Sequence, residues 1–295
     1  MIDLIDKYQL DLLYFDDLVL PLRKDEKIGL SIAAHLYNTS LKNHNGRNDA
    51  VMNTKELNEA QRKCLIYDIE RAVSDRVEPF AWQTDTCIGR WFYNNATFKR
   101  HSYSKPAAII RVLVDIVSKN GNLLLNVPIK GDGTIDSDEV AILEDIAKWM
   151  TVSSECIFGT RPWKVYGEGR KFAKGSPGDL NKGKGGEYTA EDIRFTTKGN
   201  TLYAIALGWP ENGQLIIKTL GKNQAGLKGD ITSVQLLGSS SKLAWTRSDA
   251  ALTVTLPAQK PCEYAWALKI EGLDLAASES AECMTIIPFV GKPAK

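Results

Sequence analysis

Residues 12–17 are LeuLeuTyrPheAspAsp, a compact apolar run that ends in two acids. This pattern is typical of a buried parallel strand whose C-terminal end reaches a functional site. Further short apolar runs predict strands at 50–52, 65–69, 80–82 and 123–127. Helical patterns lie between these strands, at 28–42, 55–63, 104–119 and 137–150. Strands that alternate with helices in this way predict the α/β class with a parallel sheet.

A parallel sheet of this kind is either open or closed into a barrel. An open nucleotide-binding sheet is disfavoured, because the chain has neither a GxGxxG nor a GxxxxGK[ST] phosphate loop. We therefore expect a (β/α)8 TIM-type barrel, which needs eight strands and roughly 250 residues. About five strand candidates lie in residues 1–168. The barrel is thus expected to be partial and to lack its first strands.

The composition changes after Trp163. Residues 169–190 are rich in Gly and Lys and have no apolar period, which predicts a linker. Beyond it, short apolar runs spaced by turn residues predict an all-β sandwich domain over residues 191–295. These runs lie at 203–207, 215–220, 234–237, 252–256, 265–270 and 285–289. We expect this domain to support the barrel, with carbohydrate binding as the alternative.

Composition and charge argue against several classes of function. With 43% hydrophobic and 25% charged residues, the chain is typical of a globular protein and not of a disordered or membrane-spanning one. The formal net charge of +1 gives no reason to expect nucleic acid or another strongly charged partner. The five cysteines lack the spacing of a zinc site or a thiol redox motif. Cys262 and Cys283 either form a disulfide or remain two free thiols.

Acids at the ends of predicted strands are the first candidates for catalysis. Asp16 and Asp17 follow the first strand, and Glu70 closes a later one, AspIleGlu at 68–70. Side chains at the C-terminal ends of barrel strands face the active site. Glycoside hydrolysis needs two carboxyl groups, which separate strands can hold at the required distance. The alternative is that these acids are solvated or cap the next helix, and spacing alone does not decide.

The segment TrpGlnThrAspThrCysIleGlyArgTrpPheTyrAsn, residues 82–94, combines aromatic and hydrogen-bonding side chains in a loop after a strand. Such a mixture suits a sugar, whose apolar face stacks on an aromatic ring while its hydroxyls take hydrogen bonds. For Trp82 and Trp91, packing in the core is the alternative. His35 is expected to be structural, whereas His44 sits in a turn and His101 precedes a helix. The spacing of the three histidines predicts no metal site. No cofactor is expected.

Five segments, taken together, resemble glycoside hydrolase family 29, the α-L-fucosidases. They are TyrPheAspAsp, AspIleGluArg, residues 82–94, AsnGlyAsnLeuLeuLeuAsnValPro at 120–128 with AspGlyThrIle at 132–135, and GlyThrArgProTrp at 159–163. The resemblance covers most of residues 1–168 and is looser in the β domain. It implies a retaining double-displacement mechanism, with Asp16 as the nucleophile and Glu70 as the acid/base. Glu78 is the fallback for the second role.

The resemblance also implies substrate contacts. Tyr14, Trp82 and Trp91 are expected to bind the sugar, and Trp91 matches an aromatic that packs against fucose in relatives. Family members carry a HisHis pair on an early strand, and this chain begins after that region. An arginine that helps to hold the sugar in some members falls near Ala50.

The leading hypothesis is an exo-acting enzyme that removes terminal α-linked L-fucose from glycans or oligosaccharides. The alternatives are a catalytically silent fragment that binds at most carbohydrate or a partner, and a barrel hydrolase that acts on another sugar. No basic region followed by an apolar run opens the chain, so no signal peptide is expected in it. The full-length protein is expected to be secreted or periplasmic. Linkage preference and oligomeric state are not predicted.

Overall fold

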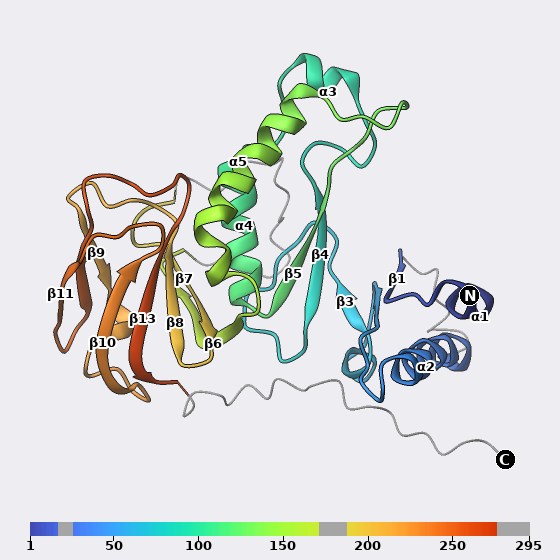
Figure 1. The fold of residues 1–295 in the computed structure, drawn as a ribbon, viewed down its shortest axis with the longest axis horizontal. Coiled ribbons are helices and arrows are strands. Elements are labelled where there is room, and N and C mark those ends of the chain that lie inside the picture. The colour runs from blue at the N-terminus through green and yellow to red at the C-terminus, as the bar shows by residue number, and fades with distance from the viewer. Residues whose placement is uncertain (17–25, 171–187, 276–295) are drawn as a thin grey trace. The chain divides into compact units, whose positions relative to one another are not determined.

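The computed structural model describes residues 1–16, 26–170 and 188–275, which form two compact units. Among the described residues, the first unit holds Met1–Glu70 and Pro79–Gln83, and the second holds Arg71–Glu78 and everything from Thr84 onward. Figure 1 shows the course of the chain through these units. Asp17, Cys283 and the predicted strand at 285–289 lie outside the described residues, so the disulfide stays a prediction.

The first unit is built on parallel strands. They are β1 (Leu12–Phe15), β2 (Val51–Thr54), β3 (Ile66–Asp68) and the start of β4 (Trp82–Cys87). With β5 (Gly121–Asn126), the sheet has the order β1-β2-β3-β4-β5, and the pairs β1/β2, β2/β3 and β3/β4 are parallel. Neighbouring strands are parallel because helices or turns return the chain to the same end of the sheet between them.

Two helices pack on this sheet within the first unit, α1 (Ile2–Tyr8) and α2 (Glu26–Asn43). Their inward faces and the strands share one apolar core, which holds Ile5, Leu13, Phe15, Ala33, Leu36, Ala50, Met52 and Leu65. Alternate residues of β1 are buried, as expected for a strand with one face against helices.

The helix predicted at 55–63 is wrong. The chain there forms only a 3-10 turn, η2 (Gln61–Lys63). Glu56 has a φ of 58°, a left-handed conformation that no α-helix of L-residues accommodates. The Asn58 side chain accepts a hydrogen bond from the Gln61 backbone N–H at 2.9 Å, and the Gln61 side chain accepts one from the Asn58 backbone N–H at 3.0 Å. These local bonds compete with helix formation.

The helices of the second unit begin at clear N-terminal signals. They are α3 (Asn95–Lys99), α4 (Pro106–Ser118) and α5 (Ser137–Ser153), the last followed by the 3-10 turn η3 (Ser154–Cys156). Pro106 starts α4, and Asp136 and Glu139 form a capping box before α5. Figure 1 shows α4 lying beside the sheet that contains β6 and β7, and the two elements are in contact.

The C-terminal part of the second unit consists of two antiparallel sheets. One has the order β10-β13-β8-β7-β6 and the other β11-β12-β9. The strands are β6 (Arg161–Glu168), β7 (Ile193–Lys198), β8 (Thr201–Ala206), β9 (Gln214–Ile217, followed by the 3-10 turn η4, Lys218–Leu220), β10 (Lys228–Leu236), β11 (Ala244–Arg247), β12 (Leu252–Thr255) and β13 (Trp266–Asp274). The predicted fold class, a parallel α/β part followed by an all-β part, is confirmed.

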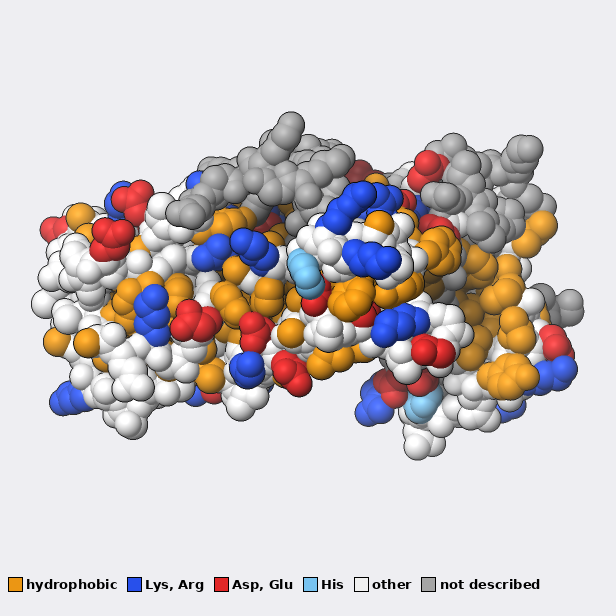
Figure 2. All heavy atoms as spheres, turned by 90° about the horizontal axis from the view of Figure 1, so that it is seen from above, with side chains coloured by type: hydrophobic (Ala, Val, Ile, Leu, Met, Phe, Trp, Pro, Cys, Tyr) orange, Lys and Arg blue, Asp and Glu red, His pale blue; other side chains and the backbone are white. Residues whose placement is uncertain are grey.

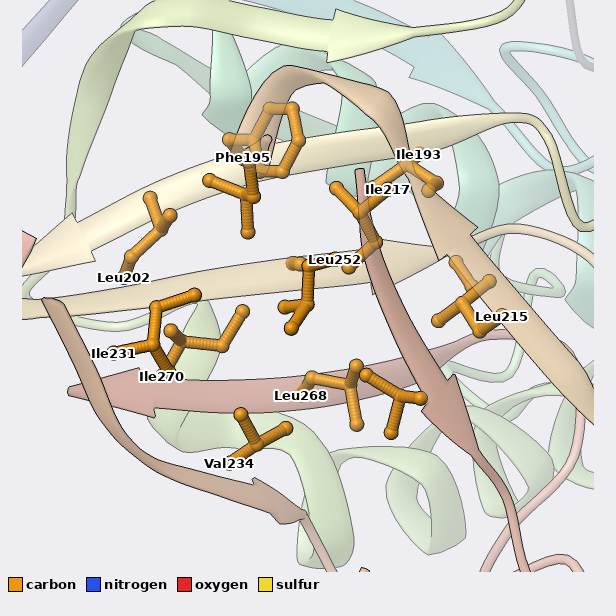
Figure 3. Close-up of a cluster of buried hydrophobic side chains, with 14 of the residues drawn as sticks. Ile193, Phe195, Leu202, Leu215, Ile217, Ile231, Val234, Leu252, Leu268 and Ile270 are labelled. Atoms are coloured by element: carbon orange, nitrogen blue, oxygen red, sulfur yellow. The ribbon is translucent and has the colours of Figure 1, made fainter. Parts of the chain in front are cut away.

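The inner faces of these two sheets form the largest apolar cluster of the described residues. Figure 3 shows side chains such as Ile193, Phe195, Leu252 and Leu268 pointing toward one another between the strands. The antiparallel sheet already includes β6, which starts at Arg161. The division predicted from sequence, at 168 and 191, stays a prediction.

A buried network of charges joins α4 to β7 within the second unit. Arg194 Nε donates to Asp115 Oδ1 at 2.6 Å, and Lys119 Nζ donates to Asp115 Oδ2 at 2.7 Å. All three side chains have no exposed surface. Lys119 also donates to the carbonyl of Ser74 at 2.8 Å, and desolvation lowers the pKa of its ammonium. Each charge thus has a partner, as a buried charge requires.

Candidate active site

A row of polar side chains crosses the C-terminal ends of the strands in the first unit. The strand register pairs Phe15 of β1 with Thr54 of β2, and Thr54 with Tyr67 of β3. The next residue on each chain segment is therefore also a neighbour of the others, and these residues are Asp16, Lys55 and Asp68. Asp68 in turn pairs with Gln83 on β4. Paired residues of parallel strands point to the same face of the sheet. The sheet therefore gathers two acids, a base and an amide that are far apart in the sequence.

Lys55 lies at the centre of this row. Its Nζ is 2.9 Å from Asp16 Oδ1, 3.0 Å from Glu70 Oε2 and 4.0 Å from Asp68 Oδ2. Because both oxygens lie close to one nitrogen, Asp16 Oδ1 and Glu70 Oε2 are no more than about 6 Å apart. The two predicted catalytic carboxylates are thus brought together, although 53 residues of chain separate them.

The two predicted carboxylates differ from Asp68 in their exposure. The Asp16 side chain is 66% exposed and that of Glu70 is 44% exposed, whereas Asp68 has no exposed side-chain surface. Asp16 and Glu70 can therefore meet a substrate that arrives from solvent. Their catalytic roles stay predictions.

Asp68 is the buried carboxylate of the polar row. It accepts hydrogen bonds from the Tyr14 hydroxyl at 2.7 Å and from Gln83 Nε2 at 3.1 Å. The hydroxyl of Tyr14, a residue predicted to bind the sugar, is thus directed at a protein carboxylate. Trp82, another predicted sugar contact, has no exposed surface and fits the alternative of core packing.

Trp91 lies in the second unit, in the loop after β4, and is partly exposed. The guanidinium carbon of Arg71 sits 5.0 Å from the centroid of its ring, and Arg71 Nη2 donates to Cys87 Sγ at 2.8 Å. Arg71 therefore takes up one face of Trp91 through a cation–π contact. Its contact with the sugar stays a prediction.

Glu78, the fallback acid/base, is more buried than Glu70. Its side chain is 8% exposed, accepts a hydrogen bond from Ser74 Oγ at 2.7 Å and lies 3.5 Å from Arg76 Nε. These contacts are typical of a structural carboxylate. Glu70 is the more accessible of the two acids.

Two residues of the site were missed by sequence reasoning, Lys55 and Asp68. The arginine position of the family was placed near Ala50, which is buried at 1% exposure, whereas the cation of the site is Lys55. Lys55 follows β2 just as Asp16 follows β1, so the rule that singled out strand-end acids could have found it.

The β domain has a cavity of about 990 Å³, lined by residues that include Tyr188, Trp209, Glu191, Glu211 and Asn212. Its aromatic rings already have neighbours. Two guanidinium groups lie over the ring of Tyr188, at 5.2 and 5.3 Å, and Trp209 packs edge-to-face with another tryptophan. The carbohydrate-binding alternative for this domain stays a prediction.

The described surface carries charges of both signs. Figure 2 shows basic and acidic side chains intermixed on the face that it views. Among the described residues, no group of three His, Cys, Asp or Glu side chains could hold a metal ion. No helix in the described part of the chain is long and apolar enough to cross a membrane.

Two family models and several known proteins match this chain. The family described as Alpha-L-fucosidase matches residues 1–155, and the one described as Alpha-L-fucosidase C-terminal domain matches residues 186–271. An α-L-fucosidase of Branchiostoma floridae is 29% identical over 213 residues, which cover 68% of this chain and 41% of the relative. The human plasma α-L-fucosidase is 31% identical over 201 residues, covering 65% and 38%.

A crystal structure of Thermotoga maritima α-fucosidase, in complex with a mechanism-based inhibitor, has the same fold. It matches with a TM-score of 0.65 and 22% identity, over 91% of this chain and 54% of the other. The predicted partial barrel with a β domain is thereby confirmed as the fold. The chain spans about two fifths of the length of the curated relatives that it matches.

Proposed function

Because the chain belongs to the α-L-fucosidase family, we propose that it hydrolyses terminal α-linked L-fucose from glycans, with net retention of configuration at the anomeric carbon. The names of the curated relatives support the substrate class. The near-zero net charge suits a neutral glycan. The name of the human plasma relative supports a location outside the cytoplasm.

The proposed mechanism has two displacements. In the first, a carboxylate oxygen of Asp16 attacks the anomeric carbon, the glycosidic C–O bond breaks, and Glu70 gives its proton to the leaving oxygen. In the second, Glu70 takes a proton from water, the water oxygen attacks the same carbon, and the ester bond to Asp16 breaks. Two inversions leave the anomeric configuration unchanged.

The limit of about 6 Å between Asp16 Oδ1 and Glu70 Oε2 carries this proposal. Retaining glycosidases hold their carboxyl groups about 5–5.5 Å apart, whereas inverting enzymes leave about 6.5–9.5 Å for a water molecule. The arrangement around Lys55 supports the shorter separation. The exposure of both carboxylates also supports the proposal, since the sugar and the water must reach them.

Proton NMR of the first fucose released from 4-nitrophenyl α-L-fucoside tests the stereochemistry. We expect the α-anomer to appear first and the β-anomer only by later mutarotation. Prompt formation of the β-anomer would indicate inversion and would refute the double displacement.

Variants test the two roles in the same assay. We expect Asp16→Asn to abolish turnover and Glu70→Gln to reduce it by about 10²–10⁴-fold on substrates with poor leaving groups. Asp11→Asn and Glu59→Gln are matched controls, since both side chains are exposed in the same unit and outside the polar row. Full activity in Asp16→Asn would exclude it as the nucleophile. A folded chain without turnover would favour the catalytically silent alternative.

A further inference from the structure

Lys55 contacts both carboxylates to which the proposed function assigns a catalytic role. Its side chain is only 8% exposed, yet its ammonium reaches two acids that are 66% and 44% exposed. It follows β2, which lies between the strands that precede Asp16 and Glu70. Ion pairs with exposed carboxylates contribute little to stability, whereas burying an ammonium is costly. Stability is therefore a poor explanation for this arrangement.

We propose that Lys55 is a positioning residue that fixes the separation of Asp16 and Glu70 and serves as the counter-ion of each in turn. The proposal rests on the proposed function, since it concerns the same two carboxylates. Lys55 acts through these acids, because its Nζ lies about 3 Å from an oxygen of each.

The movement of negative charge during the two displacements supports the proposal. Before the first step, Asp16 is ionised and Glu70 carries the proton that it will donate. In the glycosyl ester, Asp16 has no charge and Glu70 is ionised. One negative charge therefore moves from one neighbour of Lys55 to the other, and the ammonium faces it at both stages. A fixed cation that pairs with either carboxylate needs no reorganisation during the reaction.

The third carboxylate strengthens this argument. Asp68 Oδ2 lies 4.0 Å from Lys55 Nζ, in a side chain with no exposed surface. Like charges that share a site disfavour ionisation of one another. Without the ammonium, the negative charges of these carboxylates would repel one another across the polar row.

The first test is covalent labelling of the whole chain with 2-deoxy-2-fluoro-α-L-fucosyl fluoride. In this reaction an Asp16 oxygen bonds to the anomeric carbon, and the C–F bond breaks as fluoride leaves with the electron pair, so no acid is needed. Lys55→Met is compared with Lys55→Arg, which keeps the charge. Lys63→Met is the control, because Lys63 is exposed in the same unit and away from the polar row.

We expect Lys55→Met to slow labelling and kcat for 4-nitrophenyl α-L-fucoside by about 10²-fold, with a much smaller change in KM. The acidic limb of its kcat/KM profile should move to higher pH. Lys55→Arg should recover part of the rate and the pH profile, and Lys63→Met should match the unmodified chain. A Lys55→Met variant with the rates and pH profile of Lys63→Met would overturn the proposal.

A second measurement separates this proposal from the proposed function. If the unmodified chain neither labels nor turns over, the proposed function fails for this polypeptide. The position of Lys55 is then judged from crystal structures of the unmodified chain and of Lys55→Met. A wider separation of Asp16 and Glu70 in the variant supports a bridging cation, and an unchanged separation overturns it. If Lys55→Met does not fold, Lys55→Gln takes its place.

Discussion

Removing the guanidinium of Arg194 should destabilise the second unit severely. Arg194 donates to Asp115 and to the carbonyls of Ile193, Glu168 and Arg170, at 2.6, 3.0, 3.1 and 2.8 Å. Arg194→Met leaves a fully buried carboxylate with one cation in place of two. Breaking a buried pair by removing one partner costs about 3–5 kcal/mol. We expect a loss of that size in the free energy of unfolding.

Urea titrations followed by far-ultraviolet circular dichroism measure this loss. Asp115→Asn should cost at least as much, because it leaves both Arg194 and Lys119 buried without their carboxylate. Lys148→Met is the control, since Lys148 pairs with Asp145 at 2.9 Å on the surface, where the lysine side chain is 73% exposed. Its cost should stay below about 1 kcal/mol. If Arg194→Met costs no more than this control, the network does not stabilise the unit.

Three further predictions concern single side chains of the second unit. Gly272→Ala should cost about 1–3 kcal/mol in urea, because Gly272 has a φ of 103° and a Cβ would collide with a carbonyl across the strand pair. Trp149→Phe should cost about 1–3 kcal/mol by the same measurement, since it removes the donor to a buried carbonyl at 2.8 Å. Hydrogen bonds from Lys269 and Tyr203 lower the pKa of Glu155. The ionised carboxylate therefore stabilises the fold at pH values above its ordinary pKa of about 4.3. This stabilisation is lost as the pH falls through the lowered pKa. In Glu155→Gln, urea midpoints measured from neutral to acidic pH should fall less steeply than in the unmodified chain.

The apolar strands and long helices could be predicted because their patterns are local. β1 lies at 12–15 as expected, and α4 and α5 lie within a few residues of the predicted helices. The strand expected at 80–82 instead runs from Trp82 to Cys87. Its polar side chains are all buried, and some are satisfied by partners on another strand, as Gln83 is by Asp68. An apolar pattern cannot detect such a strand.

The acids of the candidate site could be predicted, and the cation between them was not. Asp16 and Glu70 stood out because each follows an apolar strand. Lys55 follows a strand too, but its meaning depends on the register of β1 and β2, which pairs residues that lie 39 positions apart. Register is set by the packing of the whole sheet, and a single sequence carries little local information about it.

The division of the chain into two units also separates its tryptophans. Six of the seven lie in the second unit, and Trp82 is alone in the first. The intrinsic fluorescence of the chain should therefore report almost entirely on the second unit. A variant with the other six replaced by phenylalanine would emit only from Trp82, the residue next to Gln83 in the polar row. Quenching or a spectral shift of that emission would then give an optical signal for events at the candidate active site.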